Sequence, residues 1–237
     1  IERYKYKPRN AIQENGKSFL HIDNIQKFSA KYYNIIRLIR ACKGIVFIYS
    51  KYLKPGAISL AMALEENGYD KFSLKGTDEN MLDGSSGVRK IDYQGKYFDE
   101  YEPSKQREFK SAKYIILTGK LNKVKLNEYV KQLRGEGPNK NIRGEHIKIV
   151  IGTGVVEQGL SFHRVREVHI LDPWHHLNRL EQAVGRALRY KSHLKLDPPD
   201  RNVTIFLHIS TPPTSSIEYK DKIELNDERV YRKAYIK

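Results

Sequence analysis

The chain has few of the features that mark secreted, membrane-spanning or metal-binding proteins. Its 237 residues include one cysteine, so no disulfide can form within the chain, which fits a reducing compartment. There is no run of about 18 apolar residues and no visible signal peptide, so neither a membrane span nor membrane partners are expected. The eight histidines have no Cys or His partner at ligand spacing, so no metal site is expected.

The sequence also lacks the signatures that bind nucleotide and magnesium. The segment most similar to a phosphate-binding loop is residues 11–18. In this segment Ala11 replaces the first glycine of the loop pattern, and no apolar strand precedes the segment. Residues 227–229 read Asp-Glu-Arg, yet they follow polar residues rather than the buried strand that a magnesium-binding acidic box needs. We therefore expect no complete site for a nucleotide and magnesium in this chain.

Positive charge is in excess. Lys and Arg number 43 against 28 Asp and Glu, which gives a formal charge of +15 and a pI near 9.6. Such a surface favours polyanionic partners, nucleic acid first and anionic membrane second. The excess is greatest in residues 105–148, with twelve Lys or Arg against four Glu. The charge alone is also explained by a bias in composition, so only the motifs can distinguish that explanation from nucleic-acid binding.

Short apolar runs alternate with helical patterns. Strands are predicted at residues 45–49, 114–117, 147–151, 167–171 and 203–209, and helices at 29–42, 55–67, 122–133 and 177–189. Alternation of this kind predicts an α/β fold, a mostly parallel sheet with helices on both faces.

The domain organisation follows from composition. Residues 1–28 are expected to form a linker or arm with a short strand at 18–21, and residues 29–210 the α/β domain. Residues 76–104, rich in Gly, Ser and Asp, are interpreted as a loop-like insertion within it. Residues 211–237 form a polar tail with a predicted helix at 226–237 that continues into a missing segment.

Small and hydroxyl residues follow the predicted strands. The carboxyl ends of parallel strands share one edge of the sheet, where ligands bind. Glycine and hydroxyl residues suit a phosphodiester chain, because they allow close backbone approach and hydrogen bonds that do not read sequence. The predicted nucleic-acid contacts at this edge are Ser50, Thr118, Gly119, Thr153 and Gly154, with Asp172 at the end of a further strand.

The segment from Leu177 to Arg189 sorts into two stripes when read as a helix. The apolar stripe is Leu177, Leu180, Val184 and Ala187, and the polar stripe, about 200° away, is Arg179, Gln182, Arg186 and Arg189. A solvated amphipathic helix explains this pattern, and so does a row of guanidinium groups that grips phosphate.

The order of residues in two segments, 149–162 and 182–189, is more specific than the helical periodicity. Residues 182–189 read Gln-Ala-Val-Gly-Arg-Ala-Leu-Arg and resemble motif VI of superfamily 2 helicases, Q-x-x-G-R-x-x-R. Residues 149–162 resemble motif V, and Ser192-His193 is similar to the helicases of large nucleocytoplasmic DNA viruses, a group that includes the ATPase subunit of the poxvirus early transcription factor and nucleoside triphosphatase I. The resemblance implies a RecA-like carboxy-terminal lobe of an ATP-dependent helicase or translocase.

The resemblance also implies roles for residues. Arg186 and Arg189 would reach ATP phosphates on another lobe, one of them as an arginine finger, and Gln182 would orient the same phosphates. Gly159, Ser161 and Gly185 would lie beside the nucleotide, and Thr153 would touch the nucleic-acid backbone. Gln158 departs from the usual motif V text, which leaves its role open.

Partners and cofactors follow from the same resemblance. The full-length protein would use ATP and Mg²⁺, although this segment alone would bind neither and would be inactive. Its partners would be DNA or RNA in single-stranded form, an amino-terminal helicase lobe in the same polypeptide and viral transcription machinery. Its location would be the host cytoplasm or the virion.

Two other functions stay open. The chain could be a basic nucleic-acid-binding module without catalysis, or a module that docks a transcription partner through residues 76–104.

Three side chains have alternative interpretations. Trp174 either stacks on a base or packs in the core, Arg179 is either a phosphate ligand or a surface ion pair, and His193 has a capping or core-polar role by default.

Overall fold

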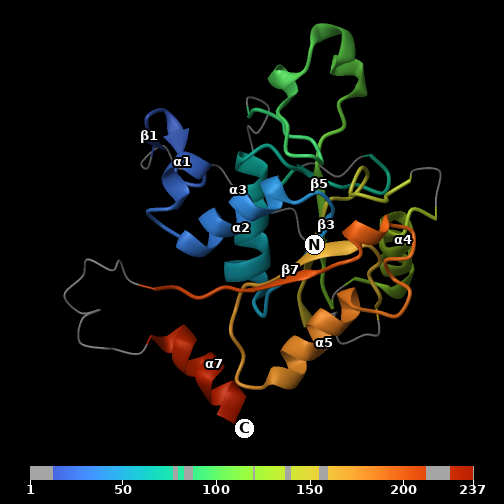
Figure 1. Cartoon of the computed structure of the whole chain (residues 1–237). Helices are drawn as coiled ribbons and strands as arrows, with labels where there is room; N and C mark the ends of the chain where they lie inside the picture. The colour runs from blue at the N-terminus through green and yellow to red at the C-terminus, as the bar shows by residue number, and fades with distance from the viewer. Residues whose placement is uncertain are drawn as a thin grey trace.

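A six-stranded sheet forms the centre of the molecule. The computed structural model describes residues 13–76, 80–82, 88–119, 121–136, 140–154, 160–211 and 225–236. All neighbouring strands of the sheet are parallel, which confirms the predicted α/β fold. In spatial order the strands are β4 (Asp70–Lys71), β5 (Lys113–Leu117), β6 (Ile149–Gly152), β3 (Ile45–Tyr49), β7 (Val165–Ile170) and β8 (Thr204–Leu207), as Figure 1 shows in part.

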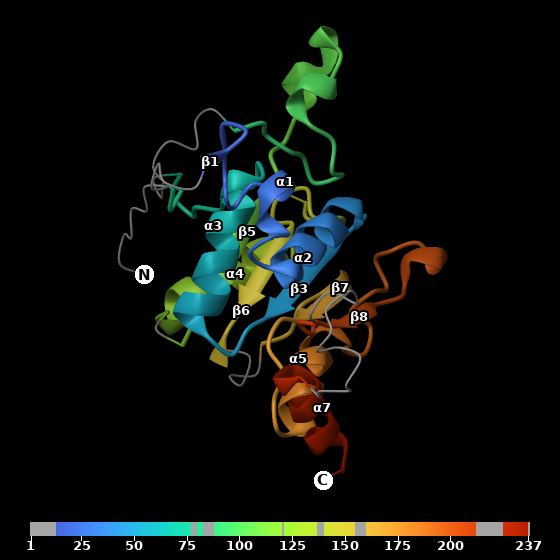
Figure 2. The same ribbon diagram turned by 90° about the vertical axis from the view of Figure 1, so that its left-hand side faces the viewer.

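Helices cover both faces of this sheet. The helices α2 (Ala30–Ala41) and α3 (Ser59–Glu66) pack on one face, whereas α4 (Lys123–Leu133) and α5 (Leu177–Ala187) pack on the other. Figure 2 shows α2 and α3 in front of the strands. Every residue of β3 is buried, as expected for an apolar strand between two helical layers.

The helix starts follow the sequence signals. The Ser29 hydroxyl accepts a hydrogen bond from the Tyr32 amide (3.3 Å), and the Asn122 side chain accepts one from the Lys125 amide (2.8 Å). The helix predicted from residue 55 has a different beginning, because a π-helical turn (Leu53–Ile58) precedes α3. A Cβ atom at Gly56 would lie 2.0 Å from the Ser50 hydroxyl oxygen, so this turn requires glycine.

One buried carboxylate holds the segment that follows β4 (Asp70–Lys71), a strand that the sequence patterns missed. Glu65 is fully buried and accepts hydrogen bonds from the amides of Met81 and Leu82 (2.8 Å each) and from the Tyr114 hydroxyl (2.5 Å). It thereby fixes the segment after β4 against β5. The β4 strand consists of only two residues, both polar, so no apolar periodicity predicts it.

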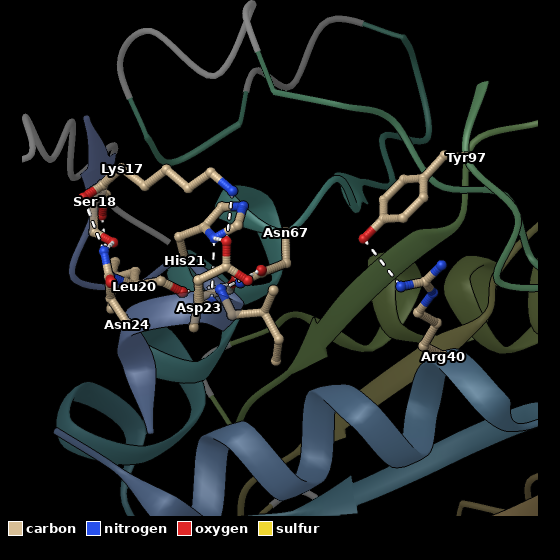
Figure 3. A network of polar contacts seen from close by, with 11 residues as sticks. Lys17, Ser18, Leu20, His21, Asp23, Asn24, Arg40, Asn67 and Tyr97 are labelled. Atoms are coloured by element: carbon tan, nitrogen blue, oxygen red, sulfur yellow. Dashed lines mark hydrogen bonds and ion pairs between the residues drawn. The ribbon is translucent and has the colours of Figure 1, made fainter. Parts of the chain in front are cut away.

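The arm before α2 is folded against the domain. It comprises a hairpin of β1 (Gln13–Glu14) and β2 (Lys17–Ser18), followed by the short helix α1 (Ile22–Ile25). Asn67, which follows α3, holds this arm in place, as Figure 3 shows. Its side-chain amide donates a hydrogen bond to the Leu20 carbonyl (2.9 Å) and accepts one from the Ile22 amide (2.8 Å).

The strand predicted at residues 18–21 is therefore wrong in its extent. The β2 strand ends at Ser18, and His21 is the N-cap of α1. The backbone groups on either side of His21 bond to Asn67 instead of a strand partner. Residues 1–12 lie outside the described residues, and the boundary at residue 28 stays a prediction.

The described part of the predicted insertion projects from the sheet (green, top of Figure 1). It contains one 3₁₀ turn (Phe98–Glu100), and a second (Pro103–Glu108) begins within it and ends beyond the predicted boundary at residue 104. The Asp92 carboxylate accepts the amides of Gln94 (2.9 Å) and Lys96 (2.8 Å) and the hydroxyl of Tyr101. These bonds give the projection defined turns, whereas its status as an insertion stays a prediction.

The predicted helix near the carboxyl end is confirmed as α7 (Asn226–Ile236). Asp227 pairs with Lys31 at the start of α2 (2.6 Å) and accepts the Ser210 amide (3.0 Å), while Tyr231 is buried in the core beside α5. Among the described helices, none has the length and apolar character that a membrane crossing requires.

Two stacked histidines join β7 to β8. His169 is fully buried, and its Nδ1 lies 2.9 Å from Nε2 of His208, while its Nε2 lies 3.1 Å from the Glu167 carboxylate. Burial, the neighbouring His169 and then Lys31 lower the pKa of His208 to about 4. The folded state therefore disfavours the imidazolium form of His208.

Replacing the buried carboxylate should destabilise the fold. In Glu65→Gln, one amide N–H₂ group must face a backbone or hydroxyl donor, so the free energy of unfolding should fall by about 2–3 kcal/mol in urea denaturation. The control is Glu66→Gln, because Glu66 is only half-buried and should change stability by less than about 0.5 kcal/mol. Equal effects of the two variants would contradict the role of Glu65.

Acid should destabilise the fold through His208. Its pKa is lower in the folded state than the unfolded value of 6.5, so its contribution is complete above pH 6.5 and is lost as pH falls toward about 4. The expected loss is about 2 kcal/mol at pH 5. His208→Gln should remove this component of the pH dependence of urea denaturation, whereas His175→Gln, an exposed control, should retain it.

Candidate functional site

The parallel register brings the predicted edge residues to one level. Tyr49 of β3 pairs with Gly152 of β6 and with Ile170 of β7, and Leu117 of β5 also pairs with Gly152. The residues that follow these positions are Thr118, Thr153, Ser50 and Leu171, in spatial order across the sheet. With about 4.8 Å between neighbouring strands, this row extends over roughly 14 Å.

At this edge the glycine backbone is exposed to solvent, whereas the residues with hydroxyl side chains are buried. Ser50, Thr118 and Thr153 are 0%, 2% and 6% exposed, whereas Gly119 and Gly154 are exposed and have no atom within 4 Å of an added Cβ. The structure thus brings all five predicted residues to one edge. Only the two glycines offer free surface there.

The Ser50 side chain has a structural partner. Its hydroxyl lies 2.7 Å from the Asp172 carboxylate, which also accepts the Lys51 amide (3.0 Å). This carboxylate links the end of β3 to the end of β7. The sequence placed both residues at one edge but gave no sign that they pair.

Cationic groups lie over the indole ring of Trp174. The Lys51 ammonium is 3.9 Å and the Arg179 guanidinium carbon 4.6 Å from the ring centre. Trp174 is half-buried and packs against the core beside α5. This geometry favours the packing interpretation of Trp174, and it gives Arg179 an aromatic partner.

The α5 helix has the two faces that the sequence predicted. Leu180, Ala183 and Ala187 are buried, whereas Gln182 and Gly185 are exposed. An added Cβ at Gly185 would meet nothing within 4 Å, so the surface above it is open.

Arg186 is the distinctive side chain of this face. It is half-buried, and its Nε atom is shielded from solvent without a hydrogen-bond partner among the described residues. Within the same part of the chain, Arg186 forms no ion pair. A buried guanidinium nitrogen without a partner is costly unless a ligand satisfies it.

The placement of Arg189 on the helix is corrected by the structure. The helix ends at Ala187, and Leu188 leaves the helical region with φ −101° and ψ 55°. Arg189 is exposed in the turn that follows, where its carbonyl accepts the Ser192 amide (3.0 Å). The 3.6-residue periodicity extends past the true helix end, because periodicity carries no stop signal.

The last residues of motif V cross the end of α5. The Phe162 amide donates to the Arg186 carbonyl (2.9 Å), and the ring of Phe162 packs on Phe47 with centres 4.8 Å apart. Ser161 lies beside this bond and lines a shallow hollow with Lys131 and Arg134 of α4 and its C-cap. Gly159 lies outside the described residues, so its predicted role stays untested.

The Ser192-His193 pair has a structural role. His193 bonds to the Ser192 hydroxyl (2.8 Å) through Nδ1 and to the Val165 carbonyl (2.7 Å) through Nε2. The Ser192 carbonyl accepts the Arg164 amide (3.1 Å). These bonds fasten the chain after motif VI to the start of β7, which supports the core-polar reading of His193.

Sequence reasoning missed the basic residues around this face. Lys51, Lys131 and Arg134 carry no motif signature, and only the fold brings them near Trp174 and Ser161. Their one sequence signal was the general excess of positive charge.

The family comparison now agrees with this geometry. The helicase conserved C-terminal domain family matches residues 61–191, more than half of the chain. This chain belongs to that family. The match spans β5, β6 and β7 together with α5, the elements that build the edge and the arginine face.

Two viral relatives illustrate the similarity. A protein of Acanthamoeba polyphaga mimivirus named as an ATP-dependent RNA helicase is 26% identical over 206 residues, which cover 86% of this chain and 30% of the relative. The early transcription factor large subunit homolog of an African swine fever virus isolate is 28% identical over 203 residues, covering 84% and 17%. The chain therefore spans less than a third of either relative.

Solved structures with a similar fold include the carboxy-terminal part of the Fun30 ATPase domain (TM-score 0.49, 16% identity, 90% of this chain and 46% of that one). The carboxy-terminal domain of the DEAD-box protein Dbp5 has a TM-score of 0.44 at 16% identity, with 77% and 71% covered. The fold assignment rests on the parallel strand order and the family match.

Glycine at position 185 should be dispensable for folding. Gly185→Ala places a methyl group in open space within a helix, so we expect the free energy of unfolding to rise by about 0.5–1 kcal/mol. In Gly44→Ala the added Cβ would lie 2.2 Å from Cγ of Arg166, so stability should fall. Urea denaturation of both variants checks this; a destabilised Gly185→Ala protein would show that Gly185 serves packing instead of an open surface.

Proposed function

We propose that this domain is the lobe of an ATP-dependent helicase or translocase that completes a nucleotide pocket begun by a preceding lobe. The observation that carries the proposal is Arg186, with its buried, unpartnered Nε beside the open surface of Gly185. Polyphosphate would satisfy this guanidinium. The Phe162–Arg186 bond adds support, because it holds Ser161 next to the same site.

In this proposal Arg186 and Arg189 act on the transferred phosphoryl group. Negative charge spreads over the γ-phosphoryl oxygens in the transition state, and a guanidinium placed there lowers the barrier by up to about 10³–10⁵-fold in rate. Arg189 lies in a turn and can move toward a second lobe without unwinding α5. Gln182, exposed on α5, orients the same phosphates, and Ser161 bonds to the ribose. ATP and Mg²⁺ are thus cofactors of the longer protein.

The carboxyl edge of the sheet is proposed to hold single-stranded nucleic acid. The backbones of Gly119 and Gly154 contact phosphates, while the buried Ser50, Thr118 and Thr153 shape the turns that present them. The α5 helix begins at this edge and carries Arg186 in its last turn. Nucleic-acid binding at one end of α5 is thereby linked to nucleotide binding at the other.

A second candidate function has its own support. The projection (residues 88–112) stands away from the sheet in Figure 1, and one relative is named an early transcription factor subunit. Docking of a transcription partner through this projection is compatible with a helicase lobe. The same viral relatives are the basis for proposing host cytoplasm or virion as the location.

Loss of the arginine finger should slow hydrolysis while substrate binding persists. In a protein that carries the preceding lobe, Arg186→Ala and Arg189→Ala should each lower the turnover number; the residue acting as the finger should lose at least about 10²-fold, with a smaller change in KM. Arg186→Lys should recover little, because lysine lacks the planar fork of donors.

Arg143→Ala is the matched control for this assay. Arg143 is an exposed arginine that pairs with Asp197 (3.0 Å) away from α5, so its loss should leave turnover unchanged. Turnover in Arg186→Ala and Arg189→Ala equal to that of Arg143→Ala would remove the finger assignment.

A further inference from the structure

A second basic hollow lies at the opposite edge of the sheet. Lys113 is the first residue of β5, and His146 comes shortly before β6, so both lie at the amino ends of the strands. A strand of five residues places this edge roughly 17 Å from the carboxyl edge. The lining residues are Phe109, Lys110, Ser111, Lys113, Lys140, Glu145 and His146.

The lysines of this hollow lack acidic partners. Elsewhere ammonium groups pair with carboxylates, as in Lys90 with Asp70 and Lys31 with Asp227 (2.6 Å each). By contrast, no described residue forms an ion pair with Lys110, Lys113 or Lys140. The one acid present, Glu145, accepts the backbone amide of Arg143 (2.8 Å).

The hollow therefore concentrates positive potential. Lys113 is half-buried, which weakens the screening of its charge by water. Burial, then Lys113 and Lys110, lowers the pKa of His146, so this imidazole is neutral near pH 7 and can donate or accept a hydrogen bond. Three ammonium groups that repel each other gain energy when an anion lies between them.

The hollow fits phosphate better than an acidic peptide. Peptide docking usually needs an apolar or aromatic anchor pocket. The one phenylalanine here, Phe109, is already packed edge-on against Phe98 and Tyr101, with ring centres 5.1 and 5.6 Å away. Lysines with an imidazole suit backbone phosphates, which they hold without reading sequence.

We propose that Lys110, Lys113 and Lys140 bind the sugar-phosphate backbone of nucleic acid at a second site, on the edge of the lobe remote from the carboxyl-edge surface. The inference rests on the proposed nucleic-acid function. It extends that function by giving the lobe a contact with single-stranded or duplex nucleic acid beyond the carboxyl-edge surface.

Oligonucleotide binding to the 237-residue chain tests the proposal. The triple variant Lys110→Gln, Lys113→Gln, Lys140→Gln is compared with Lys27→Gln, Lys43→Gln, Lys195→Gln, whose three exposed lysines lie outside the hollow. Both lower the formal charge from +15 to +12. The measurement is fluorescence anisotropy of a labelled oligonucleotide across a salt series, after matched urea midpoints establish folding.

The hollow variant should bind about 10-fold or more weakly at low salt than the control variant, and the slope of log K against log salt should fall by about 2. Equal affinities and slopes in the two variants would overturn the proposal. Unchanged oligonucleotide binding with loss of binding to a polyglutamate probe would also overturn it, in favour of an acidic protein partner.

The two proposals fail in different ways. In a two-lobe protein, the hollow variant should keep the turnover number at saturating oligonucleotide and raise the half-saturating concentration. A two-lobe protein without ATPase, together with the anisotropy difference, would refute the proposed nucleotide function and keep the second binding site. A normal ATPase without that difference would refute only the second site.

Discussion

The parallel register at the centre of the sheet is the constraint on which the remaining structure depends. Because β5, β6, β3 and β7 run in one direction and end level with one another, every loop that follows them emerges at a single edge. Asp172 then joins the ends of β3 and β7 through Ser50, and the turn after β7 leads directly into α5. The surface proposed for nucleic acid and the helix with the arginines are therefore directly connected.

Two sets of polar side chains differ in their partners. Glu65 and Asn67, which are buried, and Asp172, which is half-buried, make hydrogen bonds inside the chain that hold loops or strands in place. The second set, Arg186 and the lysines of the amino-edge hollow, has no acidic partner among the described residues. Arg186 has a buried nitrogen without a partner, which costs free energy, and the lysines concentrate positive charge, so we propose that anionic ligands bind at both places. The division separates structural polarity from surfaces available for binding.

Periodicity and caps predicted much of the fold. The β3 and β5 strands and the starts of α2 and α4 follow from apolar runs and from Ser29 and Asn122. The sequence could not show contacts between distant residues. Asn67 bonds to the backbone of residues 20 and 22 in place of a strand partner, β4 pairs with β5 without an apolar pattern, and Leu188 ends α5 before Arg189. At the site, the ends of the predicted strands placed the edge residues together, but the burial of three hydroxyls depends on packing that only the folded chain defines.

The most direct test of the account is a structure of the protein with the proposed preceding lobe, bound to nucleic acid, ADP and aluminium fluoride. The account predicts that the lobes close with the guanidinium of Arg186 or Arg189 within hydrogen-bond distance, about 3 Å, of the fluoride group that mimics the transferred phosphoryl. Closed lobes with both guanidinium groups in solvent, or paired with acidic side chains of the same lobe, would contradict it.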